Sequence, residues 1–348
     1  MQSQTFNVAI LGFGLSASVF HLPLICATNG LKLTHILSRQ KAKINQLDPS
    51  IMVVNDLDAI LNDPTIDLLI NTLPNDLHYS ITKECLNSGK HVVVEKPFVL
   101  DSTQGQELIG LAKQNGLLLS VYHNRRWDNA YLTLQQEMNK LGKIYLYEAY
   151  FDRYRPQVNL SKWRESAAVG SGILYDLGAH LLDQALNLFG KPQSLIADLA
   201  QQRNNAQTTD YFQLLLIYEN MRVILGSSSL CTAPRPVIAA YGEHGSYVKY
   251  GLDPQENMLR LALTPASPDY GMEAQQLAGT LVLSKDQQLV SQLLPSVCGD
   301  YPYYYRQIYQ ALLDNSLALP VSAQSGLAVI AMIEAAYSSY SLGKRIDF

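Results

Sequence analysis

The sequence has few cysteines and tryptophans and no long apolar segment, and each shortage excludes a class of protein. It contains two tryptophans and four cysteines, and the cysteines are scattered at Cys26, Cys85, Cys231 and Cys298. Their spacing matches no metal-binding or redox pattern, and no His, Asp and Glu set has the spacing of metal ligands. We therefore expect no metal and a reducing, cytoplasmic location.

Strong basic charge and membrane-spanning segments are also missing. The formal net charge is −4, and no run of lysine and arginine forms a footprint for nucleic acid. The longest apolar stretch, Leu327 to Tyr337, contains Glu334 and is too short to cross a bilayer, so it predicts a packed helix. The N-terminus lacks the pattern of a secretory signal. We expect neither a nucleic-acid partner nor a membrane role.

The length and composition fit a well-packed chain with two domains. The 348 residues exceed one ordinary core, and 47% are hydrophobic while 16% are charged. In the first third, predicted strands and helices alternate, which is typical of a doubly wound, parallel α/β sheet. From about residue 130, extended runs such as Ile144 to Phe151 and Tyr211 to Tyr218 predict an α+β domain with an open, mostly antiparallel sheet.

A glycine-rich turn follows the first predicted strand. Gly12-Phe13-Gly14-Leu15-Ser16-Ala17 matches the turn that binds the pyrophosphate of a dinucleotide. Gly12 permits the tight turn, Gly14 lets the backbone approach the pyrophosphate, and Ala17 lets the following helix pack on its strand. The free N–H groups at the start of that helix then bind the phosphates. A glycine triplet alone also fits an ordinary turn, so the surrounding sequence decides.

The second predicted strand, Leu31 to Leu37, ends in Ser38-Arg39-Gln40-Lys41, where NAD-binding proteins carry Asp or Glu. A carboxylate there repels a 2′-phosphate. Ser38 instead donates a hydrogen bond, Arg39 pairs with the phosphate or stacks on adenine, and Lys41 adds positive potential. The alternative is a solvated loop that is basic by chance. The residues favour NADP(H) over NAD as cofactor.

Five short motifs occur together along the chain. They are the Gly12/Gly14/Ala17 turn, Pro74-Asn75 with His78, Gly89-Lys90-His91-Val92, Glu95-Lys96-Pro97, and Asp176 with His180. In this combination, and over nearly the whole length, the chain resembles the glucose-fructose oxidoreductase and inositol dehydrogenase (Gfo/Idh/MocA) family. Further segments look most like its NADP-dependent scyllo-inositol dehydrogenase branch: Ser38-Arg39, Phe20-His21-Leu22-Pro23, His123 to Asp128 and Asp152 to Pro156.

The resemblance implies a domain organisation and a reaction. We expect an NADP-binding Rossmann domain over residues 1–125, an α+β substrate and oligomerisation domain over 126–325, and a C-terminal helix over 326–348 that packs back on the body. The second-domain sheet is expected to form the interface of a homodimer or homotetramer. The implied reaction is hydride transfer between nicotinamide C4 and a hydroxyl carbon of a polyol or sugar.

Lys96 follows the predicted strand His91 to Val94, at the sheet edge where ligands bind in open α/β folds. Its ammonium group can donate a hydrogen bond to the reacting oxygen and stabilise alkoxide character as hydride leaves. The alternative is a surface lysine beside a proline turn. We predict that Lys96 is catalytic and contacts both substrate and cofactor, and that Glu95 contacts the nicotinamide ribose.

Asp176, His180 and Asp183 lie at i, i+4 and i+7 of a helix predicted near residues 172–189, so they share one face. His180 is the predicted general base, because an imidazole that titrates near neutrality can accept and return the hydroxyl proton. Asp176 is predicted to bind a substrate hydroxyl and to tune the imidazole. A polar face turned to solvent is the alternative.

Other side chains are predicted to line the same site. Asn124, after the predicted strand Leu117 to Tyr122, is expected to support Lys96 or the nicotinamide amide, and Pro74-Asn75 and His78 are expected to line the nicotinamide pocket. Tyr301, near the start of a helix, is predicted to contact the substrate, with Tyr305 as the alternative, although aromatic residues there are more often core or interface.

The roles of Trp163, Arg153 and Arg155 stay open, as do the substrate's stereochemistry and the direction of the reaction. We therefore predict an NADP(H)-dependent oxidoreductase for a cyclic polyol or sugar. The alternatives are a dehydrogenase of another sugar or diol and a catalytically silent NADP-binding sensor.

Overall fold

A computed structural model describes residues 4–348, in which the chain divides into two compact units. The first unit comprises the chain up to Asn124 together with Gln255–Tyr270 and Tyr301–Leu327. The second comprises Arg125–Pro254, Gly271–Asp300 and Ala328–Phe348. Both units are discontinuous in sequence, whereas the domains expected above are continuous stretches.

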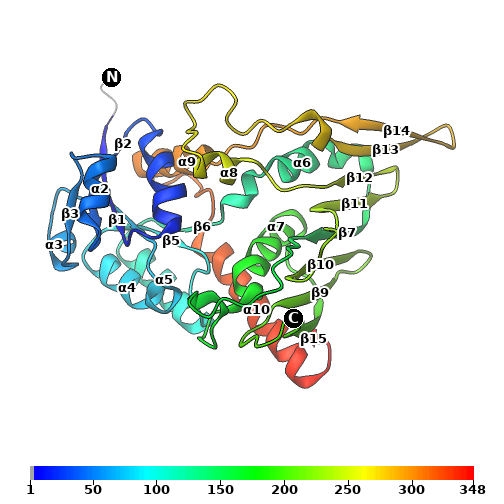
Figure 1. The fold of residues 1–348 in the computed structure, drawn as a ribbon, viewed down its shortest axis with the longest axis horizontal. Coiled ribbons are helices and arrows are strands. Elements are labelled where there is room, and N and C mark those ends of the chain that lie inside the picture. The colour runs from blue at the N-terminus through cyan, green and yellow to red at the C-terminus, as the bar shows by residue number, and fades with distance from the viewer. Residues whose placement is uncertain (1–3) are drawn as a thin grey trace. The chain divides into compact units, whose positions relative to one another are not determined.

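The first unit is built on a six-stranded sheet with the order β3-β2-β1-β4-β5-β6, and every pair in it is parallel (Figure 1). The strands are β1 (Phe6–Leu11), β2 (Leu31–Leu37), β3 (Met52–Val54), β4 (Leu68–Asn71), β5 (His91–Glu95) and β6 (Leu119–Tyr122). The strand order reverses beside β1, which creates the switch point where doubly wound sheets bind ligands. The predicted parallel α/β sheet is confirmed.

Helices flank this sheet, and the strands are correspondingly apolar. All four residues of β4 and the Val92, Val93 and Val94 side chains of β5 are buried, as expected for parallel strands covered by helices. Helix α1 (Leu22–Cys26) packs beside β2 and α9 (Pro302–Leu313), whereas α4 (His78–Asn87) packs beside β4, β5 and α5 (Ser102–Gln114). The remaining helices of this unit are α2 (Lys41–Leu47), α3 (Asp58–Leu61) and α8 (Gln255–Arg260).

Two helix ends show how local sequence fixes these elements. The Asp101 carboxylate accepts hydrogen bonds from the N–H groups of Thr103 at 2.8 Å and Gln104 at 3.2 Å, so it caps α5. Gly89, just after α4, has a φ of +78°, a conformation that glycine adopts without strain. Both helix ends therefore follow from the local sequence.

The second unit is built on a nine-stranded sheet with the order β14-β13-β12-β11-β7-β10-β9-β8-β15 (Figure 1). Its strands are β7 (Ile144–Tyr150), β8 (Ser194–Ala200), β9 (Tyr211–Ile217), β10 (Arg222–Ser228), β11 (Ile238–Gly242), β12 (Gly245–Lys249), β13 (Gly279–Lys285), β14 (Gln288–Leu294) and β15 (Ile346–Asp347). The β7–β10 pair is parallel and the other pairs are antiparallel. The predicted mostly antiparallel sheet is confirmed.

One face of this sheet carries the core. Along β9, Phe212, Leu214 and Leu216 are buried while the residues between them are half-buried, which gives the alternation expected of a sheet with one covered face. Helix α6 (Asn129–Leu141) packs on β11, β12 and β13, and α7 (Ala179–Phe189) packs on β10 (Figure 1). Helix α10 (Ala323–Leu342) contains the division between the two units, and β15 after it pairs with β8.

The structure bears on three features discussed for the sequence: membrane-spanning segments, metal sites and cysteines. Within residues 4–348, no helix is long and apolar enough to span a bilayer. In the same part of the chain, no cluster of three or more His, Cys, Asp or Glu side chains is arranged to hold a metal ion. All four cysteines are free thiols.

Candidate active site

The glycine turn connects β1 to a helical segment that starts with a π-helical turn, Ala17–His21, and continues as α1. Gly12 has a φ of +94°, and a Cβ there would lie 3.2 Å from Thr72 and Leu73 side-chain atoms, so a larger residue would be strained. A Cβ on Gly14 would meet no described atom within 4 Å, which leaves the backbone open to a ligand. Ala17 is fully buried. These features fit the pyrophosphate of a dinucleotide.

The loop after β2 is tied to this turn. The Ser38 hydroxyl accepts a hydrogen bond from the Gln40 N–H at 3.0 Å, and the Gln40 side-chain amide donates to the Phe13 carbonyl at 3.0 Å. The Lys43 ammonium lies 5.6 Å from the centre of the Phe13 ring, and Arg39 is exposed. The loop therefore presents a hydroxyl and positive charge beside the turn, which fits an anionic group of the cofactor.

Glu95 ends β5, and its buried carboxylate is held by three donors. Its Oε1 accepts hydrogen bonds from His21 Nε2 at 2.8 Å and from the Ser16 hydroxyl, and its Oε2 accepts from the Lys96 N–H at 3.0 Å. Burial raises the pKa of Glu95, but the hydrogen bonds from His21 and Ser16 and the Lys96 charge together lower it to about 2. An ionised carboxylate thus joins the glycine turn to Lys96. The contact of Glu95 with the nicotinamide ribose stays a prediction.

Lys96 is half-buried at the carboxyl end of β5 and is followed by a cis peptide bond to Pro97. The His78 ring lies between this segment and the loop after β4: its Nδ1 is 2.7 Å from the Pro97 carbonyl and its Nε2 is 2.9 Å from the Leu73 carbonyl. Burial lowers the pKa of His78, although both carbonyls favour its protonated form. His78 therefore positions the Lys96 segment, and its contact with nicotinamide stays a prediction.

Other predicted residues of the first unit are buried. Asn75 is buried just after Pro74, and Asn124 is buried just beyond β6. The Tyr301 side chain is fully buried, its ring centre lies 6.2 Å from that of Phe20, and its N–H donates to Gln255 Oε1 at 2.7 Å. Core packing, the alternative given above for Tyr301, describes these surroundings. Its substrate contact stays a prediction.

In the second unit, Asp176 and His180 lie on one continuous helical segment. Asp176 belongs to a π-helical turn, Leu174–Gly178, and His180 follows in the first turn of α7. Asp176 is half-buried and His180 is 7% exposed. Wide turns of this kind are frequent at functional sites, because the insertion redirects side chains along the helix.

The next turn of α7 anchors the helix. Asp183 is 2% exposed, and its two carboxylate oxygens accept hydrogen bonds from Arg126 Nε at 2.8 Å and Nη2 at 2.6 Å. The Gln184 side-chain amide donates to the Arg125 carbonyl at 2.6 Å. The Asp183 carboxylate is therefore enclosed in this contact and does not form an open polar face together with Asp176 and His180. Its role is to fix α7 through a buried bidentate ion pair.

A loop side chain contacts Asp176. Arg164 Nη1 lies 3.7 Å from Asp176 Oδ1, and the Arg164 guanidinium lies 5.6 Å from the centre of the Trp163 ring. The loop that carries Arg164 is also anchored by Arg203, whose Nη1 donates to Glu165 Oε2 at 3.2 Å. The Trp163-Arg164 segment is thus placed beside a predicted catalytic residue of its own unit.

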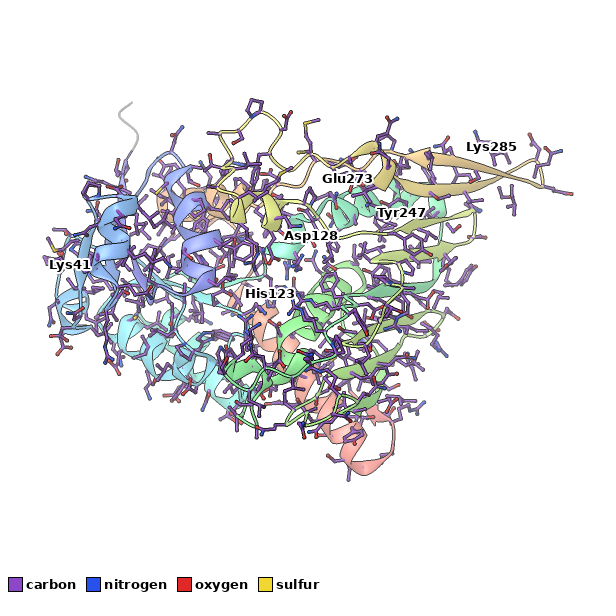
Figure 2. The ribbon with its side chains drawn as sticks, viewed as in Figure 1. Lys41, His123, Asp128, Tyr247, Glu273 and Lys285 are labelled. Carbon is purple, nitrogen blue, oxygen red and sulfur yellow. The ribbon has the colours of Figure 1, made fainter. Side chains whose placement is uncertain are left out.

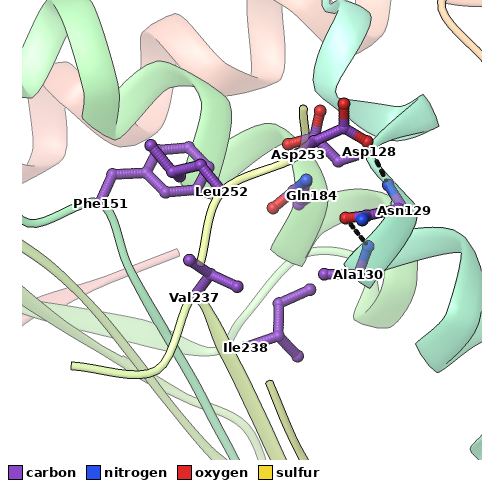
Figure 3. A pocket seen from close by; sticks show the side chains of 9 residues that line it. All are labelled: Asp128, Asn129, Ala130, Phe151, Gln184, Val237, Ile238, Leu252 and Asp253. Carbon is purple, nitrogen blue, oxygen red and sulfur yellow. Dashed lines mark hydrogen bonds between the residues drawn. The ribbon is translucent and has the colours of Figure 1, made fainter. Parts of the chain in front are cut away.

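A small cavity of the second unit lies at the start of α6 (Figure 3). Its lining residues are Asp128, Asn129, Ala130, Phe151, Gln184, Val237, Ile238, Leu252 and Asp253. Its volume is about 10 Å³, room for about one water molecule, so it does not hold a polyol. Nearby, the fully buried Lys249 pairs with Glu273 at 3.0 Å, close to Tyr247 (Figure 2). These groups stabilise the interior of the unit.

Several contacts of the site were not predicted from the sequence. His21 and Tyr305 contact the Glu95 network, and Arg126 and Arg164 pair with acidic residues of the α7 segment. His21 lies in one of the segments that resemble the scyllo-inositol dehydrogenase branch, which was the available signal. Arg126 lies in another such segment, His123 to Asp128, but the acidic partners of Arg126 and Arg164 could not be predicted, because they lie 57 and 12 positions further along the chain.

The first unit is thus a dinucleotide-binding domain with a lysine at the carboxyl end of its sheet. Two family models match the chain: "Oxidoreductase family, NAD-binding Rossmann fold" over residues 6–123 and "Oxidoreductase family, C-terminal alpha/beta domain" over residues 136–348. The chain therefore belongs to the Gfo/Idh/MocA family of oxidoreductases, as the resemblance predicted.

Individual relatives match over nearly the whole length. The chain is 41% identical to scyllo-inositol 2-dehydrogenase (NADP(+)) IolW of Bacillus subtilis, covering 96% of this chain and 94% of the relative. It is 43% identical to the uncharacterized oxidoreductase YdgJ of Escherichia coli, covering 95% of each. Among solved structures, yvaA from Bacillus subtilis superposes with a TM-score of 0.97 at 39% identity, covering 100% of this chain and 99% of that one.

Proposed function

We propose that this oxidoreductase uses NADP(H) to interconvert a hydroxyl group of a cyclic polyol or sugar, of the scyllo-inositol and inosose type, with the corresponding ketone. One observation carries the proposal: the Glu95 carboxylate that binds Ser16 of the glycine turn also binds the Lys96 N–H. The lysine is thereby tied to the turn that fits the cofactor. The printed name of the Bacillus subtilis relative, an NADP(+)-dependent scyllo-inositol 2-dehydrogenase, supports the choice of substrate and cofactor.

The chain's own residues divide the binding of NADP(H) between them. The backbone from Gly12 to Ala17 would hold the pyrophosphate, and Ser38 with Arg39 would hold the 2′-phosphate. Residues at the ends of β4 and β6, namely Pro74, Asn75, His78 and Asn124, would face the nicotinamide end. When bound, the cofactor supplies nicotinamide C4 as hydride acceptor or donor.

Lys96 would stabilise the negative charge that develops on the substrate oxygen, and His180 would accept or return the hydroxyl proton. In oxidation the C–H bond breaks with loss of hydride, the hydroxyl proton passes to His180, and the C=O bond forms. The Lys96 ammonium donates a hydrogen bond to the oxygen and stabilises its negative charge. His180 Nδ1 is buried, so we assign the proton to Nε2. Asp176 would bind a neighbouring hydroxyl and favour the imidazolium form. Reduction runs these steps in reverse.

The test is the rate of NADPH or NADH formation by purified protein with NADP or NAD, respectively, and a panel of inositols and aldoses, against an enzyme-free blank. We expect turnover of scyllo-inositol with NADP and much less with NAD. Turnover of another sugar or diol would show that the proposed substrate is wrong and that the proposed type of reaction is right. Tight NADPH binding with no turnover of any panel member, in either direction, would favour the NADP-binding sensor.

We also infer that the protein assembles as a homodimer or homotetramer through the second-unit sheet. Ile196, Leu215 and Ile224 lie directly opposite one another across β8, β9 and β10, on the face away from the buried side chains. Ile196 is 41% exposed, and Leu215 and Ile224 are half-buried. An apolar row of this kind needs a cover. Light scattering should give a dimer or tetramer for the wild type and a smaller species for Leu215→Arg.

A further inference from the structure

A chain of buried side chains lies behind Lys96 in the first unit. The Tyr305 hydroxyl contacts His21 Nδ1, His21 Nε2 contacts Glu95 Oε1 at 2.8 Å, and the same Glu95 oxygen accepts from the Ser16 hydroxyl. The second Glu95 oxygen accepts from the Lys96 N–H at 3.0 Å. His21 and Tyr305 are both 0% exposed. Two segments far apart in sequence therefore meet at the Glu95 carboxylate, and a third, which carries Tyr305, is linked to it through His21.

The ionised carboxylate of Glu95 fixes the direction of the hydrogen bonds that it receives. Glu95 is ionised at neutral pH because its pKa is lowered to about 2, so it only accepts, and His21 must carry its proton on Nε2. Burial raises the pKa of Tyr305 well above its ordinary value, so the phenol keeps its proton and can donate to His21 Nδ1. The two ring nitrogens of His21 therefore bridge the Tyr305 hydroxyl and the Glu95 carboxylate.

Aromatic packing holds the imidazole in place. The His21 ring centre lies 4.3 Å from that of Tyr122, and Tyr122 packs edge-on against Tyr304 at 4.9 Å. His21 also closes the π-helical turn that follows the glycine turn. A shift of His21 would therefore move the Glu95 carboxylate, and with it the hydroxyl of Ser16 and the backbone of Lys96.

We propose that His21 and Tyr305 are positioning residues: they hold the Glu95 carboxylate where it joins the cofactor turn at Ser16 to the Lys96 backbone. Neither is proposed to touch the substrate. This inference rests on the proposed function for the role of Lys96, but the alignment of the turn and the lysine is a property of the protein without ligand. A purely structural role would affect stability alone.

Helix α9 offers a matched pair of variants. Tyr304 and Tyr305 are adjacent, both are 0% exposed, and the Tyr304 hydroxyl bonds to Ser120 Oγ at 2.7 Å instead of to His21. Tyr305→Phe and Tyr304→Phe each remove one buried hydroxyl, so their effects on thermal stability should be similar. Only Tyr305→Phe interrupts the chain to Glu95.

Two measurements separate the variants without substrate. The first is the NADPH dissociation constant, followed by nicotinamide fluorescence; we expect about a tenfold rise in Tyr305→Phe and less than about twofold in Tyr304→Phe. The second is the rate at which a limiting amine-acylating reagent labels Lys96 in the cofactor-free protein, followed by mass spectrometry. We expect this rate to change at least about threefold in Tyr305→Phe and to stay at the wild-type value in Tyr304→Phe.

Substitutions of His21 provide a rescue test. His21→Leu removes both hydrogen bonds, whereas His21→Gln keeps an N–H donor within reach of Glu95. We expect His21→Gln to recover part of the NADPH affinity and of the Lys96 labelling rate that His21→Leu loses. Equal losses in the two variants, with normal Tyr305→Phe, would show that His21 only fills space.

The outcomes also separate this inference from the proposed function. If Tyr305→Phe and Tyr304→Phe match in both measurements, the positioning role is wrong even if scyllo-inositol is turned over. If the two variants differ as expected while no polyol is turned over, the positioning role holds and the proposed substrate fails. If NADPH does not bind the wild type, the positioning role is tested by the Lys96 labelling rates of the two variants alone.

Discussion

Lys96 and His180 are held in different ways, although each lies close to a π-helical turn of its own unit. Lys96 follows a buried strand, and its backbone is fixed by a carboxylate that three donors surround. His180 lies on a helix that is anchored one turn later by the buried Arg126–Asp183 pair. Asp176, one turn before His180, lies 3.7 Å from a half-exposed arginine.

This difference suits the two proposed tasks. A lysine that stabilises developing negative charge acts best when it is fixed before the reaction, because no reorganisation is then needed. A proton carrier must exchange its proton in each turnover, so its immediate surroundings need more freedom than its scaffold. In the second unit, the Arg126–Asp183 pair anchors the helix one turn away from His180, while the contact of Asp176 with Arg164 is loose. This arrangement keeps the scaffold rigid and leaves freedom around the imidazole.

The largest expected effects remove the two side chains themselves. Lys96→Met should lower kcat by about a thousandfold through loss of charge stabilisation, and His180→Ala by about a hundredfold to ten-thousandfold through loss of the proton carrier. NADPH affinity should stay within a few-fold of wild type for His180→Ala. Steady-state kinetics and fluorescence titration measure both. Turnover that survives either change would contradict the assigned role.

A second prediction concerns the anchor of α7. Asp183→Asn removes the charge that pairs with Arg126, whose side chain is 12% exposed, so the free energy of unfolding should fall by about 3 kcal/mol. Asp347→Asn is the matched control: the Arg345–Asp347 pair at 2.9 Å is exposed, with side chains 55% and 70% accessible, and should be worth less than about 1 kcal/mol. Urea unfolding compares them. Similar losses would mean that Asp183 is no anchor.

A third prediction uses the pKa of Glu95, which is lowered from 4.5 to about 2. Because its folded-state pKa is the lower one, Glu95 contributes stability above about pH 4.5 and loses it as the pH falls toward 2. The contribution at neutral pH is about 3 kcal/mol. Glu95→Gln should therefore be less stable than wild type at pH 7, and the gap should narrow between pH 4.5 and 3. A gap that is constant with pH would refute the ionised network.

Much of the fold followed from the sequence. The bounds predicted for the strand Leu31–Leu37 agree with the structure, because the apolar pattern of a strand is a local signal. Glu95-Lys96 is likewise a short local motif that the sequence displays, and the roles assigned to it stay predictions. The side chains that support them were not: Tyr305 reaches His21 across 284 positions, and Arg164 reaches Asp176 from a loop. Only tertiary packing brings such partners together.

The smallest expected effect tests the loose contact beside His180. The Arg164 side chain is 49% exposed and lies 3.7 Å from the Asp176 carboxylate, so Arg164→Gln should change the free energy of unfolding by less than about 0.5 kcal/mol. Because Asp176 is predicted to bind a substrate hydroxyl, the same change should alter KM by about two- to fivefold with little effect on kcat. A stability loss as large as that of Asp183→Asn would show that both contacts near α7 are rigid anchors, and the contrast between the two units would then disappear.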